Sequence, residues 1–589
     1  MLDYVLNKKP FNLRNLVRHL LLFFILIASF PAVMSAQSEE AQEPSTLLPD
    51  INPQDIEIRG DFRARFPGIS RQPILGFNPT PRIYRIDPNR MPFLETPEQV
   101  VASVPFSQLE AELGPPRMFT SHPESSSILG YTGFGMFVSP EAELYASVPL
   151  NEHTAVHSNL NFHSSDGHLT DEQGTNGAFR RADGSISINR KVNQTGLLGV
   201  QLRGRSDFSD MSRFQPRNNR TELHSGGVGL SWLNIKSAFD HTQLYASADY
   251  SQVNEIFNQN VMPITLPVVI NEFEQSKEWA FNIGGVKSWA GNRIGHVFSI
   301  ETDHQVGLYE LDNSGKNWFV SSLSGYWKKD SSNGSRLTLG LRAFTGFDEI
   351  SDMVVRAYPH VEYSLTTKNG LRIGGLLSGE LRNHGHENAF ITNRSLISSN
   401  LLANEQRVFS NLSAELDLGN LITLHGYAHA SYSSRPRMFT AFGTFVHPKE
   451  LLLLRPGAGV SFHISPGLLT LYSDAYVNFT RVDDTTVSRF ENMEKFRLTA
   501  GLRANPADNL IIQTWLDILG SRHINEAAAS NDNSDAGSAL LLNIKAEYRV
   551  NGLIGIYIKG LNMLGQEYNR WSFYEERPLQ VYGGITFKI

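Results

Sequence analysis

Cysteine is absent from this chain of 589 residues. Its absence excludes a disulfide scaffold, a thiolate metal site and a cysteine nucleophile. It also suits a chain that crosses an oxidising compartment unfolded, because no thiol can be oxidised there. A basic excess is missing too: 52 lysines and arginines stand against 59 acidic residues, for a net charge of -7. Nucleic acid, which needs a basic protein surface, is therefore not an expected partner.

Long apolar runs are scarce outside the first 36 residues. Residues 20–30 read LLLFFILIASF, follow several basic residues and precede the small-residue segment PAVMSA. This apolar core is shorter than the ~20 residues of a membrane-spanning helix and has the layout of a secretory signal peptide. We expect residues 1–36 to be a signal peptide cleaved near Ser35 or Ala36. An uncleaved membrane anchor is the alternative.

The next part of the chain has little regular pattern. Residues 37–55 are acidic and contain prolines, which is typical of a flexible linker. Residues 56–127 are irregular, with several prolines and one short segment of helical character that begins after Thr96. No sustained alternation of apolar and polar residues is found here.

Alternation begins near residue 128 and continues almost to the end of the chain. Residues 469–479 read LTLYSDAYVNF, and residues 542–550 read LNIKAEYRV. A strand points successive side chains to opposite faces, so each segment has one apolar and one polar face. These segments have the length of a membrane-spanning strand, whereas strands in soluble proteins are mostly shorter.

The connections between these segments alternate between short and long. Short turns near 150–152, 419 and 551 each join the two strands of a hairpin, and the longer polar connections between hairpins include 208–223 and 253–275. A transmembrane barrel has short periplasmic turns and long external loops, and its sheet must close because a bilayer tolerates no open edge. We therefore predict an all-β fold, a transmembrane antiparallel β-barrel of about 22 strands over 128–589.

A barrel of this size has a lumen too wide for its own side chains to fill. Residues 56–127 are the only substantial non-barrel part on the periplasmic side, so we predict that they form a reduced plug in the lumen. A disordered periplasmic tail is the alternative. Pairing is expected between its basic residues Arg71, Arg82, Arg85 and Arg90 and the luminal acids Asp249, Glu415, Asp417 and Asp474.

The end of the chain, 555–589, resembles the C-terminal end of TonB-dependent outer-membrane receptors. The matching features are a turn asparagine, an aromatic residue, an Arg-Pro loop and a glycine pair: Asn562, Tyr568, Arg577, Pro578, Gly583 and Gly584. Residues 131–147 and 163–167 look like the opening strands of a plug-reduced subgroup of these receptors. Phe587 stands two residues before the end, where a terminal aromatic is usual in such barrels.

This resemblance implies uptake or passage of an unidentified solute across the outer membrane. The implied partners are outer-membrane lipid, the barrel assembly machinery, a TonB-type energy coupler and a small-molecule ligand. No clear TonB box is found, and the alternative is a non-transporting barrel, either a surface receptor or an assembly partner. Catalysis is not expected, because no G-x-S-x-G elbow or comparable motif marks a nucleophile.

Two sets of residues are candidates for ligand binding. Basic residues on the polar faces of neighbouring strands could contact an anionic ligand in the lumen: Arg497, Arg503, Lys545, Arg549 and Lys559. A ladder that pairs with Asp517 and Glu547 is the structural alternative. In a predicted external loop, His384, His386 and Glu387 could capture zinc or copper, and a solvated loop is the alternative.

Other candidates are weaker. His157 with His163, and His425 with His429, are predicted to face the lumen in pairs too far apart to share one ion, which favours a polar lining. Residues 531–537 (NDNSDAG) offer oxygen ligands for calcium but lack the spacing of an EF-hand loop. No cofactor is expected.

Overall fold

The computed structural model describes residues 125–589, apart from residues 172–173, 211–216, 238, 261–268, 292–294, 312–313, 332–333, 349–351, 368, 384, 388–402, 420, 440–444, 466–467, 484–492, 524–534 and 572–573. The predicted signal peptide and linker, and nearly all of the predicted plug, therefore lie outside the described residues. Within the described part, no helix is long and apolar enough to cross a membrane.

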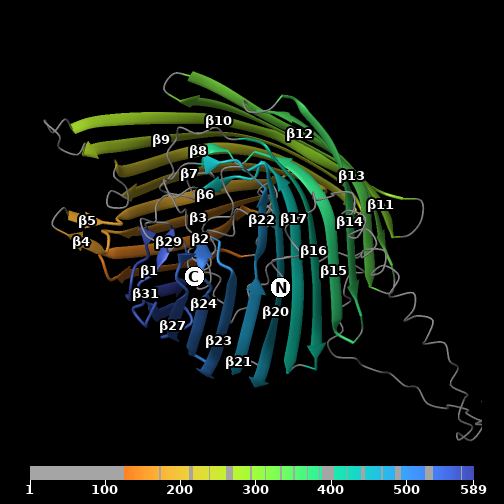
Figure 1. Ribbon diagram of the computed structural model, residues 1–589. Coiled ribbons are helices and arrows are strands. Elements are labelled where there is room, and N and C mark those ends of the chain that lie inside the picture. The colour runs from red at the N-terminus through yellow and green to blue at the C-terminus, as the bar shows by residue number, and fades with distance from the viewer. Residues whose placement is uncertain are drawn as a thin grey trace, which may run out of the picture. The chain divides into compact units, whose positions relative to one another are not determined.

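The described chain forms one large antiparallel sheet that curves around a lumen (Figure 1). Its strands are β1 (Ser127–Gly135), β2 (Ser139–Asn151), β3 (Thr154–Ser165), β6 (Phe179–Lys191), β7 (Gly196–Asp210), β8 (Arg217–Ser237), β9 (Asp240–Asn260), β10 (Val269–Ala290), β11 (His296–Leu311), β12 (Ser314–Asp330), β13 (Ser335–Phe347), β14 (Val354–Thr366), β15 (Leu371–Arg382), β16 (Glu405–Leu418), β17 (Ile422–Ser434), β20 (Glu450–Ser465), β21 (Leu469–Val477), β22 (Phe479–Asp483), β23 (Phe496–Ala507), β24 (Leu510–Leu519), β27 (Ala539–Arg549), β28 (Ile554–Leu561) and β31 (Gln580–Lys588).

Four small two-stranded sheets lie in the longer connections. They pair β4 (Leu169–Asp171) with β5 (Gly174–Asn176), β18 (Met438–Phe439) with β19 (Phe445–Val446), β25 (Arg522–His523) with β26 (Asp535–Ala536), and β29 (Asn569–Trp571) with β30 (Tyr574–Glu575).

The large sheet closes on itself. The first strand, β1, pairs with β2 on one side and with the last strand, β31, on the other. At this seam, Ile128 and Ile589 exchange two backbone hydrogen bonds of 2.8 Å. β21 and β22 pair with neighbouring parts of β20 and are one strand interrupted at Asn478, so the barrel has 22 strands. The predicted fold and strand number are confirmed.

The two faces of the wall differ as the alternation predicts. On β28, the side chain of Ile558 is 60% exposed and that of the next residue, Lys559, is 4% exposed. Because the sheet is closed, the exposed apolar face is the outside of the barrel. Leu471 and Ile544, from the two alternating segments described above, and Leu424 on β17 are all exposed on this outer face.

Some predicted boundaries are wrong at the external end of the barrel. The connection predicted over 253–275 is mostly strand, because β9 and β10 pair as far as Asn260 and Val269. Backbone pairing continues here beyond the length that a membrane requires, where both faces meet water and the alternation is lost. Within residues 131–147, the first strand ends at Gly135, and a tight turn with positive φ at Phe137 and Val138 leads into β2.

Candidate functional site

The five predicted basic residues all face the lumen but do not form one site. Lys545 and Lys559 are direct cross-strand partners, and Arg503 lies two strands from Lys545 on the same row of paired residues. Arg497 and Arg549 lie further along their strands, toward opposite ends of the barrel.

Carboxylates accompany these cations. The Arg497 guanidinium donates to Asp517 Oδ1 at 2.9 Å, and Lys559 Nζ donates to Glu141 Oε2 at 2.8 Å. Arg549 Nε lies 3.9 Å from Glu547 Oε1. Three of the five cations thus lie beside carboxylates, and Lys559 lies beside Glu141, a partner that the sequence did not indicate.

Glu141 belongs to a network that bridges the barrel seam. The Tyr557 hydroxyl on β28 donates to Glu141 Oε1 on β2 at 2.6 Å, across the two strands β31 and β1. The ring can cross because Gly133 and Gly584 lie beneath it, where an added Cβ would overlap Tyr557. Side chains from the second strand and from the last hairpin thus hold the seam together.

The Arg-Pro loop before the last strand also contacts the lumen wall. The buried Arg577 guanidinium lies over the Phe179 ring at 5.0 Å and donates to the Tyr582 hydroxyl at 3.0 Å. His163 packs edge-on against Phe179 with ring centroids 5.0 Å apart. Part of the last external connection is therefore held against the inner face of β3, β6 and β31.

The predicted loop residue His386 is buried in the lumen wall, with only 3% of its surface exposed. Its ring nitrogens lie 3.1 Å from Ser251 Oγ on β9 and 2.7 Å from Ser276 Oγ on β10. Its backbone N–H donates to Glu278 Oε2 at 2.7 Å. Burial lowers the pKa of His386 to about 3, so the imidazole is neutral at neutral pH.

Neighbouring residues extend this contact. The Ser225 hydroxyl on β8 donates to Glu387 Oε1 at 2.6 Å, and Trp318 Nε1 on β12 donates to Glu278 Oε1 at 2.7 Å. The alternative of a solvated loop is therefore wrong for His386. We call the contact of His386 and Glu387 with β8, β9 and β10 the lumen latch.

The external end of β15 leads the chain to the lumen latch. β15 pairs with β14 only as far as Leu377, whereas its pairing with β16 continues to Arg382. The buried Leu381 packs with Trp318 and Phe344, which face the lumen from β12 and β13. The external end of this hairpin therefore packs against the inner wall instead of continuing in line with β14.

A third inward contact lies on another side of the barrel. Met438, which precedes β20, and Met493, which precedes β23, form a buried cluster with Leu451 and Leu453. The two leucines face the lumen from the external end of β20, since the next residue, Leu454, is exposed on the outer face. Described parts of several external connections therefore pack against the inner wall at its external end.

The remaining candidates are not brought together into a metal site. His157 bonds with Ser147, His425 with Asp474, and His429 with Asn411. In the part of the chain that the structure describes, no group of three histidine or acidic side chains is arranged to hold a metal ion. His384 and residues 531–534 lie outside the described residues, so capture of zinc, copper or calcium by their loops stays a prediction.

The luminal acids chosen as partners for the plug have partners within the barrel. Asp249 pairs with Arg203, and Arg372 pairs with both Glu415 and Asp417. Asp474 accepts from Tyr427 as well as from His425. Arg203 and Arg372 stay about half exposed, so this charged lining faces open space in the described part of the barrel.

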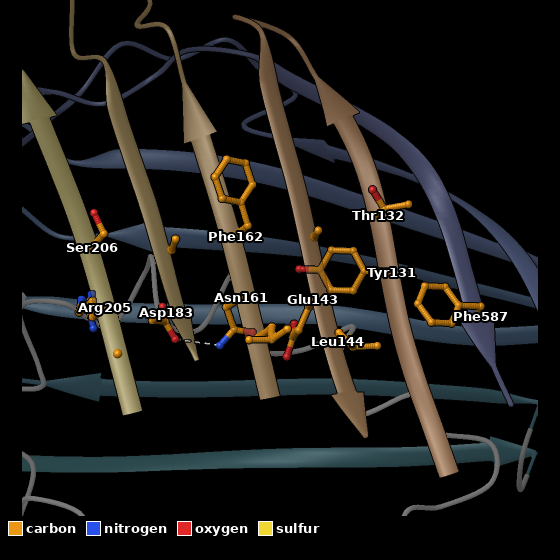
Figure 2. Close-up of a pocket in the computed structure, with 14 residues that line it drawn as sticks. Tyr131, Thr132, Glu143, Leu144, Asn161, Phe162, Asp183, Arg205, Ser206 and Phe587 are labelled. Carbon is orange, nitrogen blue, oxygen red and sulfur yellow. Dashed lines mark hydrogen bonds between the residues drawn. The ribbon is translucent and has the colours of Figure 1, made fainter. Parts of the chain in front are cut away.

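A second feature lies on the outer wall. An apolar hollow of about 710 Å³ is lined by residues of β1, β2, β3, β6, β7 and β31. Figure 2 shows Phe162 and Phe587 among its lining residues, and it also shows the hydrogen bond of 2.9 Å from Asn161 to Asp183. No sequence pattern indicates this hollow, because its residues come from six strands.

These features define the class of the protein: a closed 22-stranded barrel with an apolar exterior and a charged lumen. No protein-family model and no curated protein sequence matches the chain. Solved structures do match, and they are TonB-dependent receptors.

The copper transporter OprC is 9% identical, with a TM-score of 0.63 over 79% of this chain and 81% of OprC. The FrpB iron transporter from Neisseria meningitidis is 10% identical, with a TM-score of 0.63 over 79% of this chain and 83% of FrpB. The siderophore receptor PirA from Acinetobacter baumannii is 9% identical, with a TM-score of 0.61 over 79% and 80%. The chain therefore has the barrel fold of TonB-dependent receptors, which confirms the resemblance of its C-terminal end.

Proposed function

We propose that this protein is an outer-membrane barrel that takes up or passes a small solute, in the manner of TonB-dependent receptors. The observation that carries the proposal is the closed 22-stranded wall, whose apolar outer face suits lipid and whose inner face is charged. Similar solved barrels include a copper transporter, an iron transporter and a siderophore receptor, at low sequence identity. Metal ions or metal complexes are accordingly the first solutes to test.

The proposal includes the parts of the chain outside the described residues. Residues 1–36 direct export and are cleaved near Ser35 or Ala36, residues 37–55 are a periplasmic linker, and residues 56–127 are a reduced plug in the barrel formed by 128–589. The barrel assembly machinery inserts the protein, and a TonB-type coupler energises it. The five basic residues, Arg497 among them, contact an anionic solute in competition with Asp517, Glu547 and Glu141.

One observation favours a second function, a non-transporting binding or structural barrel. The lumen latch, the Arg577 contact and the Met438 cluster all hold parts of external connections against the inner wall. A barrel that is permanently covered could present its external surface to a partner without passing a solute.

Uptake by whole cells separates the two functions. Cells with and without the gene are given radioactive ferric complexes or copper, each with and without a protonophore. Transport predicts gene-dependent uptake that the protonophore abolishes. If the protein is found in the outer membrane with heat-modifiable migration but its loss changes the uptake of neither metal, the second function is favoured. Recovery of the protein in the soluble periplasm would contradict both functions.

A further inference from the structure

The hollow on the outer wall includes Gly204, which leaves no side chain there and belongs to a row of glycines. Gly184, Gly204 and Gly226 are direct neighbours on β6, β7 and β8, and all three point outward. The same row continues to Leu160 on β3 and Leu144 on β2, whose side chains line one side of the hollow. The next outward-facing row toward the external loops carries Phe162 on β3 and the small residues Ala182 and Ser206 on β6 and β7.

The surroundings of the hollow differ at its two ends. Toward the short turns, the outer face carries large apolar side chains, among them Ile186 and Leu202, which is 58% exposed. Toward the external loops, Ser206 Oγ bonds with the exposed His224 at 3.2 Å, and the Arg220 guanidinium lies over the Phe208 ring. One end of the hollow therefore adjoins an apolar surface, and the other end adjoins polar side chains.

We propose that this hollow binds an acyl chain of a membrane lipid from the external leaflet; the proposal rests on the proposed outer-membrane location. An amphiphile with a single polar end matches a hollow that is polar at one end only. An empty hollow within a bilayer would forfeit the van der Waals contacts of its lining. A flexible acyl chain can enter it between Leu144, Leu160 and Phe162, and its headgroup then lies level with His224.

A glycine substitution tests the proposal without disturbing the wall. In Gly204→Leu, the added Cβ meets nothing nearer than the Ser225 carbonyl oxygen at 3.9 Å, so the leucine fills the hollow. Gly325→Leu is the matched control, because Gly325 points outward on β12, two residues from the exposed Leu323, and no atom lies within 4 Å of its Cβ. Ala182→Leu is a second variant that fills the same hollow.

The readout is native mass spectrometry of folded barrels released from outer membranes, with heat-modifiable migration as the check of folding. We expect the unmodified protein and Gly325→Leu to retain a bound lipid, and both filling variants to lose it several-fold. Equal lipid retention in all four barrels overturns the proposal while leaving the outer-membrane function intact. Loss of a dimer instead of a lipid in the filling variants also overturns it and assigns the hollow to a second copy of the chain.

Discussion

Aromatic residues that lie over glycines are a recurrent feature of the inner wall. Each ring lies over a glycine of the neighbouring strand, and a Cβ added at that glycine would overlap the ring. The pairs are Tyr245 with Gly284, Tyr358 with Gly379, Tyr427 with Gly457, and Tyr472 with Gly501. Glycine in a strand interior weakens the strand unless something packs over it. Tyr557 differs from the others in spanning two glycine-bearing strands and in binding a buried acid.

Substitution of Tyr557 tests the seam network. Tyr557→Phe keeps the ring over Gly133 and Gly584 but leaves Glu141 Oε1 without its hydroxyl donor. An unsatisfied buried acceptor costs ~1–3 kcal/mol, so the free energy of unfolding should fall by about that amount. The measurement is urea unfolding of the barrel in lipid vesicles. Tyr548→Phe, on the exposed outer face, should change little; equal effects of the two variants would show that the bridge does not stabilise the seam.

Arginine substitutions on the two faces test the register of the strands. A cation near the middle of a bilayer costs roughly 2–4 kcal/mol in such barrels, so Leu471→Arg and Leu424→Arg should impair insertion. Thr470→Arg and Thr423→Arg place the cation in the lumen and should be milder. A third pair, Ile544→Arg with Asn543→Arg, is not used. Asn543 faces the lumen but is buried and accepts a hydrogen bond from the backbone N–H of Asn562, so arginine there would disturb the fold. The measurement is barrel yield in the outer membrane, and equal yields from both faces would contradict the register.

At the scale of the element, the sequence predicts the strands that cross the membrane far better than their external ends. Alternation is enforced where one face meets lipid and the other the lumen, so the outward positions of Leu471 and Ile544 could be read from the pattern. Beyond the bilayer that constraint ends, and the extensions of β9 and β10 left no pattern. The inward path of His386 could not be predicted either, because its partners Ser251 and Ser276 are more than a hundred residues away in sequence.

The lumen latch can be tested by thiol labelling in a chain that has no native cysteine. Ser276, which is fully buried beneath His386, is replaced by cysteine. Labelling of Ser276→Cys by a maleimide should be slow while the latch is closed. Adding His386→Ala and Glu387→Ala removes the side-chain bonds to β8, β9 and β10, and should speed labelling at least several-fold.

A buried serine elsewhere in the lumen supplies the control for this experiment. Ser299 on β11 is also buried and bonds with Ser288 at 2.8 Å, with no contact to the latch. Removal of the latch should leave labelling of Ser299→Cys unchanged. If both cysteines label faster, the double substitution loosens the whole barrel; if neither does, the latch does not control access to the wall.

At the scale of the whole molecule, the two halves of the lumen differ. In the external half, residues of the connections such as His386, Met438 and Arg577 pack against the inner wall. Nearer the short turns, ion pairs such as that of Arg372 with Asp417 are partly exposed. The charged, exposed half is the surface that a plug would meet. Since Arg372 and Asp417 already pair with each other, a plug would bind a surface of small net charge, and its own arginines would have to compete for these acids.

Conductance in planar bilayers separates the contributions of the two ends of the lumen. The deletion should cover residues 56–124, because β1 begins at Ser127 and pairs with Ser147. We expect the intact barrel to be nearly silent, since a lumen of this width conducts only when nothing fills it. Deletion of residues 56–124 should open a large conductance if this segment is the plug, and His386→Ala with Glu387→Ala should enlarge it further. A deletion variant that stays silent until the latch is also removed would show that the external contacts close the pore by themselves, and the plug proposal would then be wrong.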